Sequence, residues 1–204
     1  MSEKFISRPG ILKEEIIRKF IHISSGIVIS VLYAISQRDL LIIGLLLSLF
    51  IIFFFEALRF KGMISVPFLR DREKKRIGGH AFFMLGAFIS ILLFDKQIAI
   101  ASILMLSLGD AASGMAQTVK RGILDRREAY KRAIKPPDVI LVMLSVCFLV
   151  GYYTLDSLTM AICGAIGATI AEGVHLRIHG ISIDDNLNPF VFWFFNEPCF
   201  ILFE

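Results

Sequence analysis

Apolar residues occur in long blocks along the chain, and short polar stretches rich in Lys and Arg separate these blocks. Several blocks approach the roughly 20 residues that a helix needs to cross the hydrocarbon core of a bilayer. The blocks predict seven membrane-spanning helices, over residues 21–36, 40–58, 80–94, 98–119, 139–155, 158–174 and 190–203. The sequence therefore predicts an all-α, polytopic integral membrane protein, with residues 1–204 forming a single domain.

The amino-terminal segment, residues 1–20, is polar and mixed in charge. Within it, Leu12, Ile16, Ile17 and Phe20 are apolar at helical spacing, with charged residues between them. This pattern predicts an amphipathic helix along the membrane interface, directly before the first span. No short apolar region leads to a cleavage site, so we expect no removable signal peptide.

The basic residues are distributed very unevenly between the two sides of the predicted membrane domain. All Lys and Arg residues except Arg38 and Lys96 lie in the amino-terminal segment or after the second, fourth or sixth span. Positively charged segments stay in the cytoplasm, which predicts a cytoplasmic amino terminus. The formal net charge of +4 follows from these segments, and we expect no nucleic-acid partner.

Composition adds little beyond the membrane assignment, since 56% of the residues are hydrophobic. Cys147, Cys163 and Cys199 all lie in apolar runs, with neither disulfide-framework nor metal-site spacing. We interpret all three as small core residues.

Asp110 is the only charged residue between positions 104 and 117, inside the fourth predicted span. A carboxylate at the centre of such a helix costs roughly 2.5–3.5 kcal/mol, which makes a functional role the first hypothesis. The neighbours Gly109 and Gly114 are small and would let another backbone or a ligand come close. The alternative is a helix-packing patch in which Asp110 pairs with a cation on a neighbouring helix.

Other unusual polar residues fall on the same predicted cytoplasmic side. They are Arg18, Lys19, His22, Glu56, Arg59, Glu172, Asp184, Asp185 and Asn186. Carboxylates beside basic segments suit a metal ion and a polyanion such as a nucleoside triphosphate. Each element also has a structural interpretation. Glu56 and Arg59 could be a simple i, i+3 ion pair, and residues 184–186 could be an ordinary turn.

Common nucleotide and hydrolase motifs are missing from the sequence. It contains no phosphate-binding loop of the Gly-x-x-x-x-Gly-Lys-Ser/Thr type, no dinucleotide fingerprint and no His-Glu-x-x-His zinc pair. It also lacks a Gly-x-Ser-x-Gly nucleophile elbow. Nucleotide chemistry would therefore need a site of another type at the membrane surface.

The order of the polar motifs resembles the family of dolichol kinases, phytol kinases and CTP-dependent diacylglycerol kinases, which is related to phosphatidate cytidylyltransferases. The motifs are Glu15-Ile-Ile-Arg18-Lys19-Phe-Ile-His22 with Gly26, then Glu56 and Arg59, Gly109-Asp110-Ala111-Ala112, Glu172, and Gly180-Ile-Ser-Ile-Asp184-Asp185-Asn186-Leu187-Asn-Pro189. They span almost the whole chain. Two positions depart from the family pattern. Gln117 replaces a usual glycine, and Lys135-Pro136-Pro137-Asp138-Val139 replaces a Lys-Ser-x-Glu-Gly-Ser element.

The resemblance implies phosphoryl transfer from CTP, with magnesium, to a lipid hydroxyl at the cytoplasmic membrane face. The acceptor would be a polyprenol such as dolichol, a phytol-like prenol or a diacylglycerol. The catalytic residues implied are Asp110, His22 and Arg18. The nucleotide-binding residues implied are Lys19, Gly109, Gly114, Lys135, Asp138 and Asn186. The magnesium ligands implied are Asp110, Glu172, Asp184 and Asp185, and Glu56 and Arg59 would complete the site.

Two other functions stay open from the sequence. A cytidylyltransferase would use the same nucleotide and metal, but a lipid phosphate would attack CTP and release pyrophosphate. A transporter or a non-catalytic membrane scaffold would use Asp110 as a residue of an ion pathway.

Overall fold

The computed structural model describes residues 9–64, 77–129, 134–173, 177–178 and 181–182. Its helices are α1 (Pro9–Ile35), α2 (Arg38–Phe60), α3 (Gly79–Leu93), α4 (Lys96–Ala129), α5 (Pro137–Thr154) and α6 (Leu158–Gly173). Strands β1 (Arg177–Ile178) and β2 (Ile181–Ser182) form a small antiparallel pair, with Arg177 opposite Ser182. Apart from this pair, the described residues form an all-α structure, as predicted.

Each of the first six predicted spans coincides with a helix, and four helices are long and apolar enough to cross a membrane. These four are α1 from Ile16, α2, α4 as far as Val119, and α5. Helices α3 and α6 are apolar but shorter. The seventh predicted span, residues 190–203, lies outside the described residues. The four long helices indicate a multi-pass membrane protein.

Helix α1 differs from the prediction in one respect. The polar segment expected at the interface continues into the first span without a break, as a single helix of 27 residues. Its continuity follows from its sequence, because no proline or glycine interrupts the stretch between Gly10 and Gly26. One rigid helix therefore carries both the basic segment and the apolar span.

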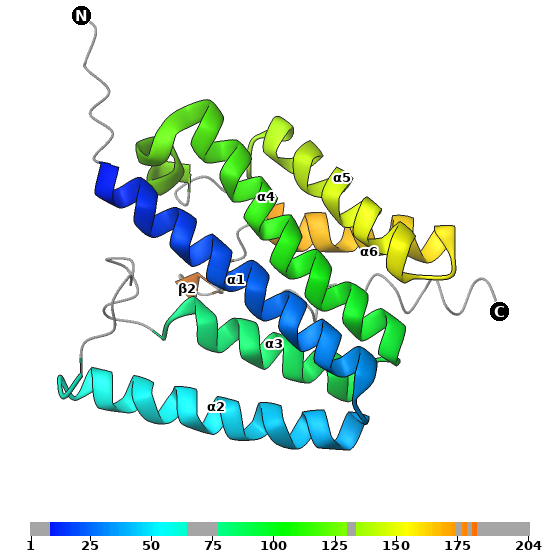
Figure 1. The fold of residues 1–204 in the computed structure, drawn as a ribbon. Coiled ribbons are helices and arrows are strands. Elements are labelled where there is room, and N and C mark those ends of the chain that lie inside the picture. Colours follow the sequence, from blue (N-terminus) through cyan, green and yellow to red (C-terminus); the bar gives the residue numbers. More distant parts are fainter. Residues whose placement is uncertain (1–8, 65–76, 130–133, 174–176, 179–180, 183–204) are drawn as a thin grey trace, which may run out of the picture.

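Successive helices run in opposite directions along the bundle (Figure 1). The short connections from α1 to α2, from α3 to α4 and from α5 to α6 all lie at one end. At this end Arg38 donates hydrogen bonds to the carbonyls of Ile91 (3.0 Å) and Leu92 (2.6 Å), and Lys96 donates to Ala34 (2.8 Å). The last carbonyls of a helix have no partner within the helix, so these two cations satisfy orphan acceptors.

Helix α4 is the central element of the bundle. In its candidate span 61% of the residues are buried, against 22–28% in the other three candidate spans. One core cluster joins α1, α2, α3 and α4, and a second joins α4, α5 and α6. Ile103 belongs to the first and Met105 to the second, so opposite sides of α4 face two cores. Helix α4 therefore connects the two cores.

The two described cysteines differ in whether they form a disulfide bond. Cys147 is free and buried, and its thiol contacts the carbonyl of Met105 at 3.7 Å. Cys163 in α6 is disulfide-bonded, so the interpretation as an unpaired core residue is confirmed for Cys147 and wrong for Cys163. Cys199 lies outside the described residues.

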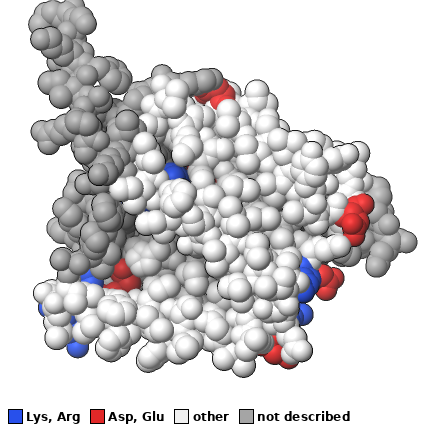
Figure 2. Space-filling model, in the orientation of Figure 1, with Lys and Arg blue, Asp and Glu red and all other residues white. Residues whose placement is uncertain are grey.

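The outer faces of the helices are strongly apolar. Figure 2 shows a face on which Lys, Arg, Asp and Glu are sparse over the middle and lie mostly toward the ends. Large exposed hydrophobic side chains are numerous on α2, for example Leu47, Phe50 and Phe54. An exposed apolar surface of this extent is unfavourable in water and suits contact with lipid.

Helices α1 and α4 approach each other very closely at Gly26. A Cβ atom at this position would lie 2.5 Å from the Cβ of Ser107 and closer still to its hydroxyl. Only glycine fits at such a distance, and small residues let two helix backbones meet. Gly26 is two turns beyond Lys19 on α1, so the same contact fixes where Lys19 meets α4.

We predict that Gly26→Ala destabilises the protein, because the added methyl group must push α1 away from α4. Overpacking of this kind typically costs about 1–3 kcal/mol. Gly44→Ala in α2 is the matched control, since nothing lies within 4 Å of a Cβ there. Thermal unfolding of the purified protein in detergent measures both. Equal melting temperatures for the two variants would contradict the close contact.

Candidate functional site

Asp110 forms a largely buried ion pair with Lys19 where α1 meets α4. The Lys19 ammonium donates to Oδ2 of the carboxylate and, at 3.1 Å, to the backbone carbonyl of the same residue. The Lys19 side chain is only 6% exposed, whereas that of Asp110 is 22% exposed. The cation is thus enclosed by the bundle, while the carboxylate keeps an opening to its surroundings.

His22 is the second residue of α1 that faces Asp110. Its Nε2 lies 3.9 Å from Oδ2 of Asp110, and its ring packs on Phe83 of α3 with 4.4 Å between the ring centroids. Lys19 and His22 are three residues apart and therefore share a face of α1. The Phe83 contact fixes the imidazole beside the carboxylate.

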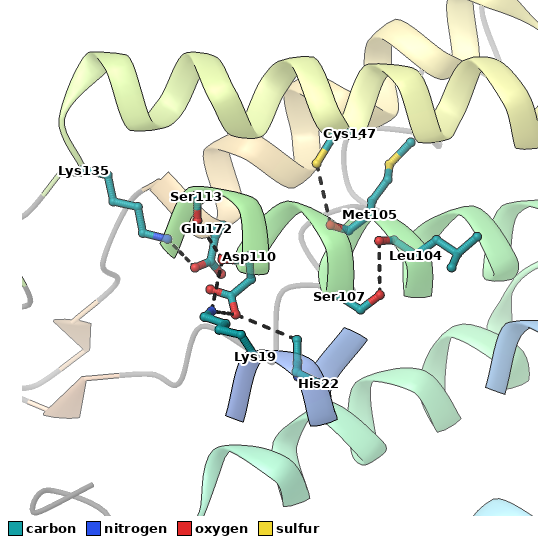
Figure 3. Close-up of polar contacts among 10 residues, drawn as sticks. All are labelled: Lys19, His22, Leu104, Met105, Ser107, Asp110, Ser113, Lys135, Cys147 and Glu172. Carbon is teal, nitrogen blue, oxygen red and sulfur yellow. Dashed lines mark hydrogen bonds and ion pairs between the residues drawn. The ribbon is translucent and has the colours of Figure 1, made fainter. Parts of the chain in front are cut away.

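A second buried ion pair, Lys135 with Glu172, lies beside the first. Lys135 lies two residues before the start of α5. Its ammonium donates to Oε1 of Glu172, and its backbone N–H donates to the carbonyl of Gly173 at 3.0 Å. Both side chains are at least nine-tenths buried. Figure 3 shows the side chains of Lys19, Asp110, Lys135 and Glu172 converging from four different parts of the chain.

We call Lys19, His22, Asp110, Lys135 and Glu172 the charge cluster. Its two lysines and two carboxylates balance, and the positive charges of both lysines act on Asp110. Moving charges from water into an apolar interior is expensive, and replacement of such pairs by apolar residues is often neutral or stabilising. The cluster therefore adds little to the stability of the fold. A functional role explains its presence better than stability does.

Glu56 and Arg59 form a separate polar group near the same end of the bundle. Arg59 donates to Oε2 of Glu56, and His80 at the start of α3 lies 3.5 Å from Oε1. Glu56 is buried, so the i, i+3 ion pair is enclosed and not merely a surface pair. Phe83, one turn after His80 on α3, links this group to His22.

The remaining predicted site residues occupy different surroundings. Gly109 faces α5, where a Cβ would lie 2.7 Å from the Cys147 sulfur, so it permits close packing of α4 and α5. Gly114 is buried on α4, Asp138 is half-buried in the first turn of α5, and Arg18 is half-buried beside Lys19. Asp184, Asp185 and Asn186 lie outside the described residues, and their roles stay predictions.

The carboxylates fit magnesium only in part. Among the described residues, no group of three or more His, Cys, Asp or Glu side chains could hold a metal ion. Asp110 and Glu172 nevertheless contribute oxygens to the same cluster (Figure 3). Magnesium is commonly held by one or two carboxylates together with substrate phosphates. Each of these carboxylates already has a lysine as its partner, so the magnesium site stays a prediction.

Sequence reasoning named all five cluster residues but missed how they pair and what supports them. Lys135 and Glu172 were assigned separately to nucleotide and metal, and the structure joins them in one ion pair. Phe83 was missed because an aromatic residue in an apolar run carries no signal of its own. Ser113, whose hydroxyl donates to the carbonyl of Asp110 at 3.1 Å, could have been noted as a polar residue one turn from Asp110.

Comparison of the chain with protein-family models, with curated proteins and with solved structures finds no match. The function must therefore be argued from the residues of the chain itself.

We predict strong coupling between Lys19 and Asp110 in a double-mutant cycle. Lys19→Met leaves Asp110 without its main partner, and Asp110→Asn leaves a buried ammonium. Either change should cost about 3 kcal/mol or more. The double variant should recover most of this loss, because no unpaired charge remains. Thermal unfolding of the four proteins measures the coupling, and additive effects would show that the pair does not form.

Proposed function

We propose that the protein is a CTP-dependent lipid kinase that phosphorylates the hydroxyl group of a polyprenol, of the dolichol type or a related isoprenoid alcohol. One observation carries the proposal. A charge-balanced cluster with a partly exposed carboxylate lies inside an apolar helix bundle, near the end predicted to face the cytoplasm. The motifs of this cluster are also those that resemble the lipid kinase family.

The reaction needs groups that place and neutralise phosphates more than it needs covalent chemistry. The lipid hydroxyl oxygen attacks the terminal phosphorus of CTP, the bond from that phosphorus to the bridging oxygen breaks, and CDP leaves. Lys19 and Lys135 are placed to neutralise charge on the phosphate oxygens, provided that each exchanges part of its contact with a carboxylate. Preorganised cations in a dry site stabilise such charge far more than they would in water.

Asp110 is the residue that we assign to the proton of the lipid hydroxyl. Among the described residues, Lys19 and His22 both approach its carboxylate at Oδ2, which leaves Oδ1 to accept the proton. Its 22% exposure supports access, whereas Glu172, at 3%, is enclosed. His22 holds the carboxylate in place through its position beside Oδ2.

The lipid would reach Asp110 from the side of the bundle. Asp110 precedes the end of its candidate span, Val119, by nine residues, or about 13 Å of helix. A water-soluble alcohol would not enter the bundle to this depth, whereas a prenol whose tail lies in the bilayer presents its hydroxyl there. Magnesium bound by the phosphates next to Asp110 and Glu172 would supply further charge neutralisation.

We predict that Asp110→Asn lowers the transfer rate at least ~100-fold, because a general base typically contributes this much or more. The assay uses purified protein in lipid nanodiscs with magnesium, a long-chain prenol and CTP labelled at the terminal phosphate. Asp39→Asn, which removes an exposed carboxylate at the opposite end of the bundle, is the control and should keep the wild-type rate.

Three outcomes would contradict the proposal. Full activity of Asp110→Asn would show that Asp110 has only a structural role. Release of pyrophosphate and incorporation of the α-phosphate with phosphatidic acid as acceptor would identify a cytidylyltransferase. Ion flux through liposomes without any turnover would identify a transporter.

A further inference from the structure

Gln117 on α4 is a buried polar residue that the cluster does not account for. It is 4% exposed, and among the described residues its amide nitrogen Nε2 has no hydrogen-bond partner. A primary amide carries two N–H donors and an acceptor, and burying such a group unsatisfied costs stability. Most buried polar groups in proteins have partners, so this amide needs an explanation.

The position of Gln117 relates it directly to Asp110. The two residues are seven apart, which is close to two turns, so they share the face of α4 that meets α1. Gln117 lies about 10 Å farther along α4 than Asp110, toward the carboxyl end of that helix. On this face the small residues Ser113 and Gly114, both buried, lie between them. This face therefore forms a continuous strip from an unpaired amide to the partly exposed carboxylate.

We infer that Gln117 is a binding residue for the phosphate chain of the nucleotide, an inference that rests on the proposed function. A nucleotide whose terminal phosphate lies at Asp110 must extend toward the end of the bundle, which brings its inner phosphates past Gln117. The Nε2 group then donates a hydrogen bond to a phosphate oxygen. An N–H donor suits this place, because phosphate accepts strong hydrogen bonds. The free protein carries the cost of the unsatisfied amide, and the ligand relieves it.

Gln117→Met tests the inference, because methionine keeps the length of the side chain and removes the amide. Binding is measured with the full chain in nanodiscs, as the thermal shift produced by magnesium with CTP and, separately, by magnesium with tripolyphosphate. We expect the apparent Kd for both probes to rise ~10-fold, the usual effect of losing a hydrogen bond to a charged group. The melting temperature without ligand should stay the same or rise, since a buried unsatisfied amide is lost.

Ser90→Ala is the matched control. The Ser90 hydroxyl is also buried, with no hydrogen-bond partner in the part of the chain that the structure describes. It lies near the opposite end of the bundle, one turn from the end of α3. This change should leave both affinities unaltered. Should Gln117→Met fail to fold, Gln117→Glu serves instead, because it keeps the shape, removes the donors and should weaken binding of both probes still further.

The outcomes separate this inference from the proposed function. Wild-type transfer activity with unchanged affinities in Gln117→Met overturns the inference alone. A loss of affinity for CTP but not for tripolyphosphate also overturns it, since the contact would then be to the nucleoside. A wild type that binds both probes but transfers no phosphate overturns the kinase, while the Gln117 variants still decide the inference. No binding of either probe by the wild type overturns both.

Discussion

The burial of the Lys19–Asp110 ion pair constrains the rest of the structure. An unpaired charge at this depth would be very costly, so α1 and α4 must meet with Lys19 opposite Asp110. Gly26 and Ser107 make that meeting possible by letting the backbones approach. His22 then falls beside the carboxylate, and its ring reaches Phe83 on α3. One charged contact thereby sets the register of three helices.

The same pair explains how a stable resting site could serve phosphoryl transfer. Lys19 and Lys135 each hold a carboxylate in the free protein, so the cluster carries no net charge from its lysines and acids. An arriving phosphate can share these lysines without a large rearrangement, because its oxygens replace carboxylate oxygens of similar charge. In the proposed reaction, such a site would be preorganised for an anion. Gln117 would extend it along α4 with a neutral donor.

The helices could be predicted from the sequence because long apolar runs have few structural alternatives, and Asp110 could be singled out because a lone charge in such a run is costly. Arg38 and Lys96, assigned to the side opposite the basic segments, indeed lie together at the other end of the bundle. The pairing within the cluster could not be predicted. Lys19 and Asp110 are 91 residues apart, and Lys135 and Glu172 are 37 apart. Helices that are apolar on all sides give no periodic signal of which face meets which neighbour.

An exchange of the two charges tests most directly whether the buried pair is a site and not only a structural contact. In the double variant Lys19→Asp with Asp110→Lys, the charges remain paired, so the melting temperature should stay close to that of the wild type. The carboxylate, however, moves from α4 to α1, away from the position assigned to the lipid hydroxyl. We predict that this stable variant transfers no phosphate from CTP to a prenol, whereas the wild type does. Equal transfer by the two proteins, or none by the wild type, would contradict the account.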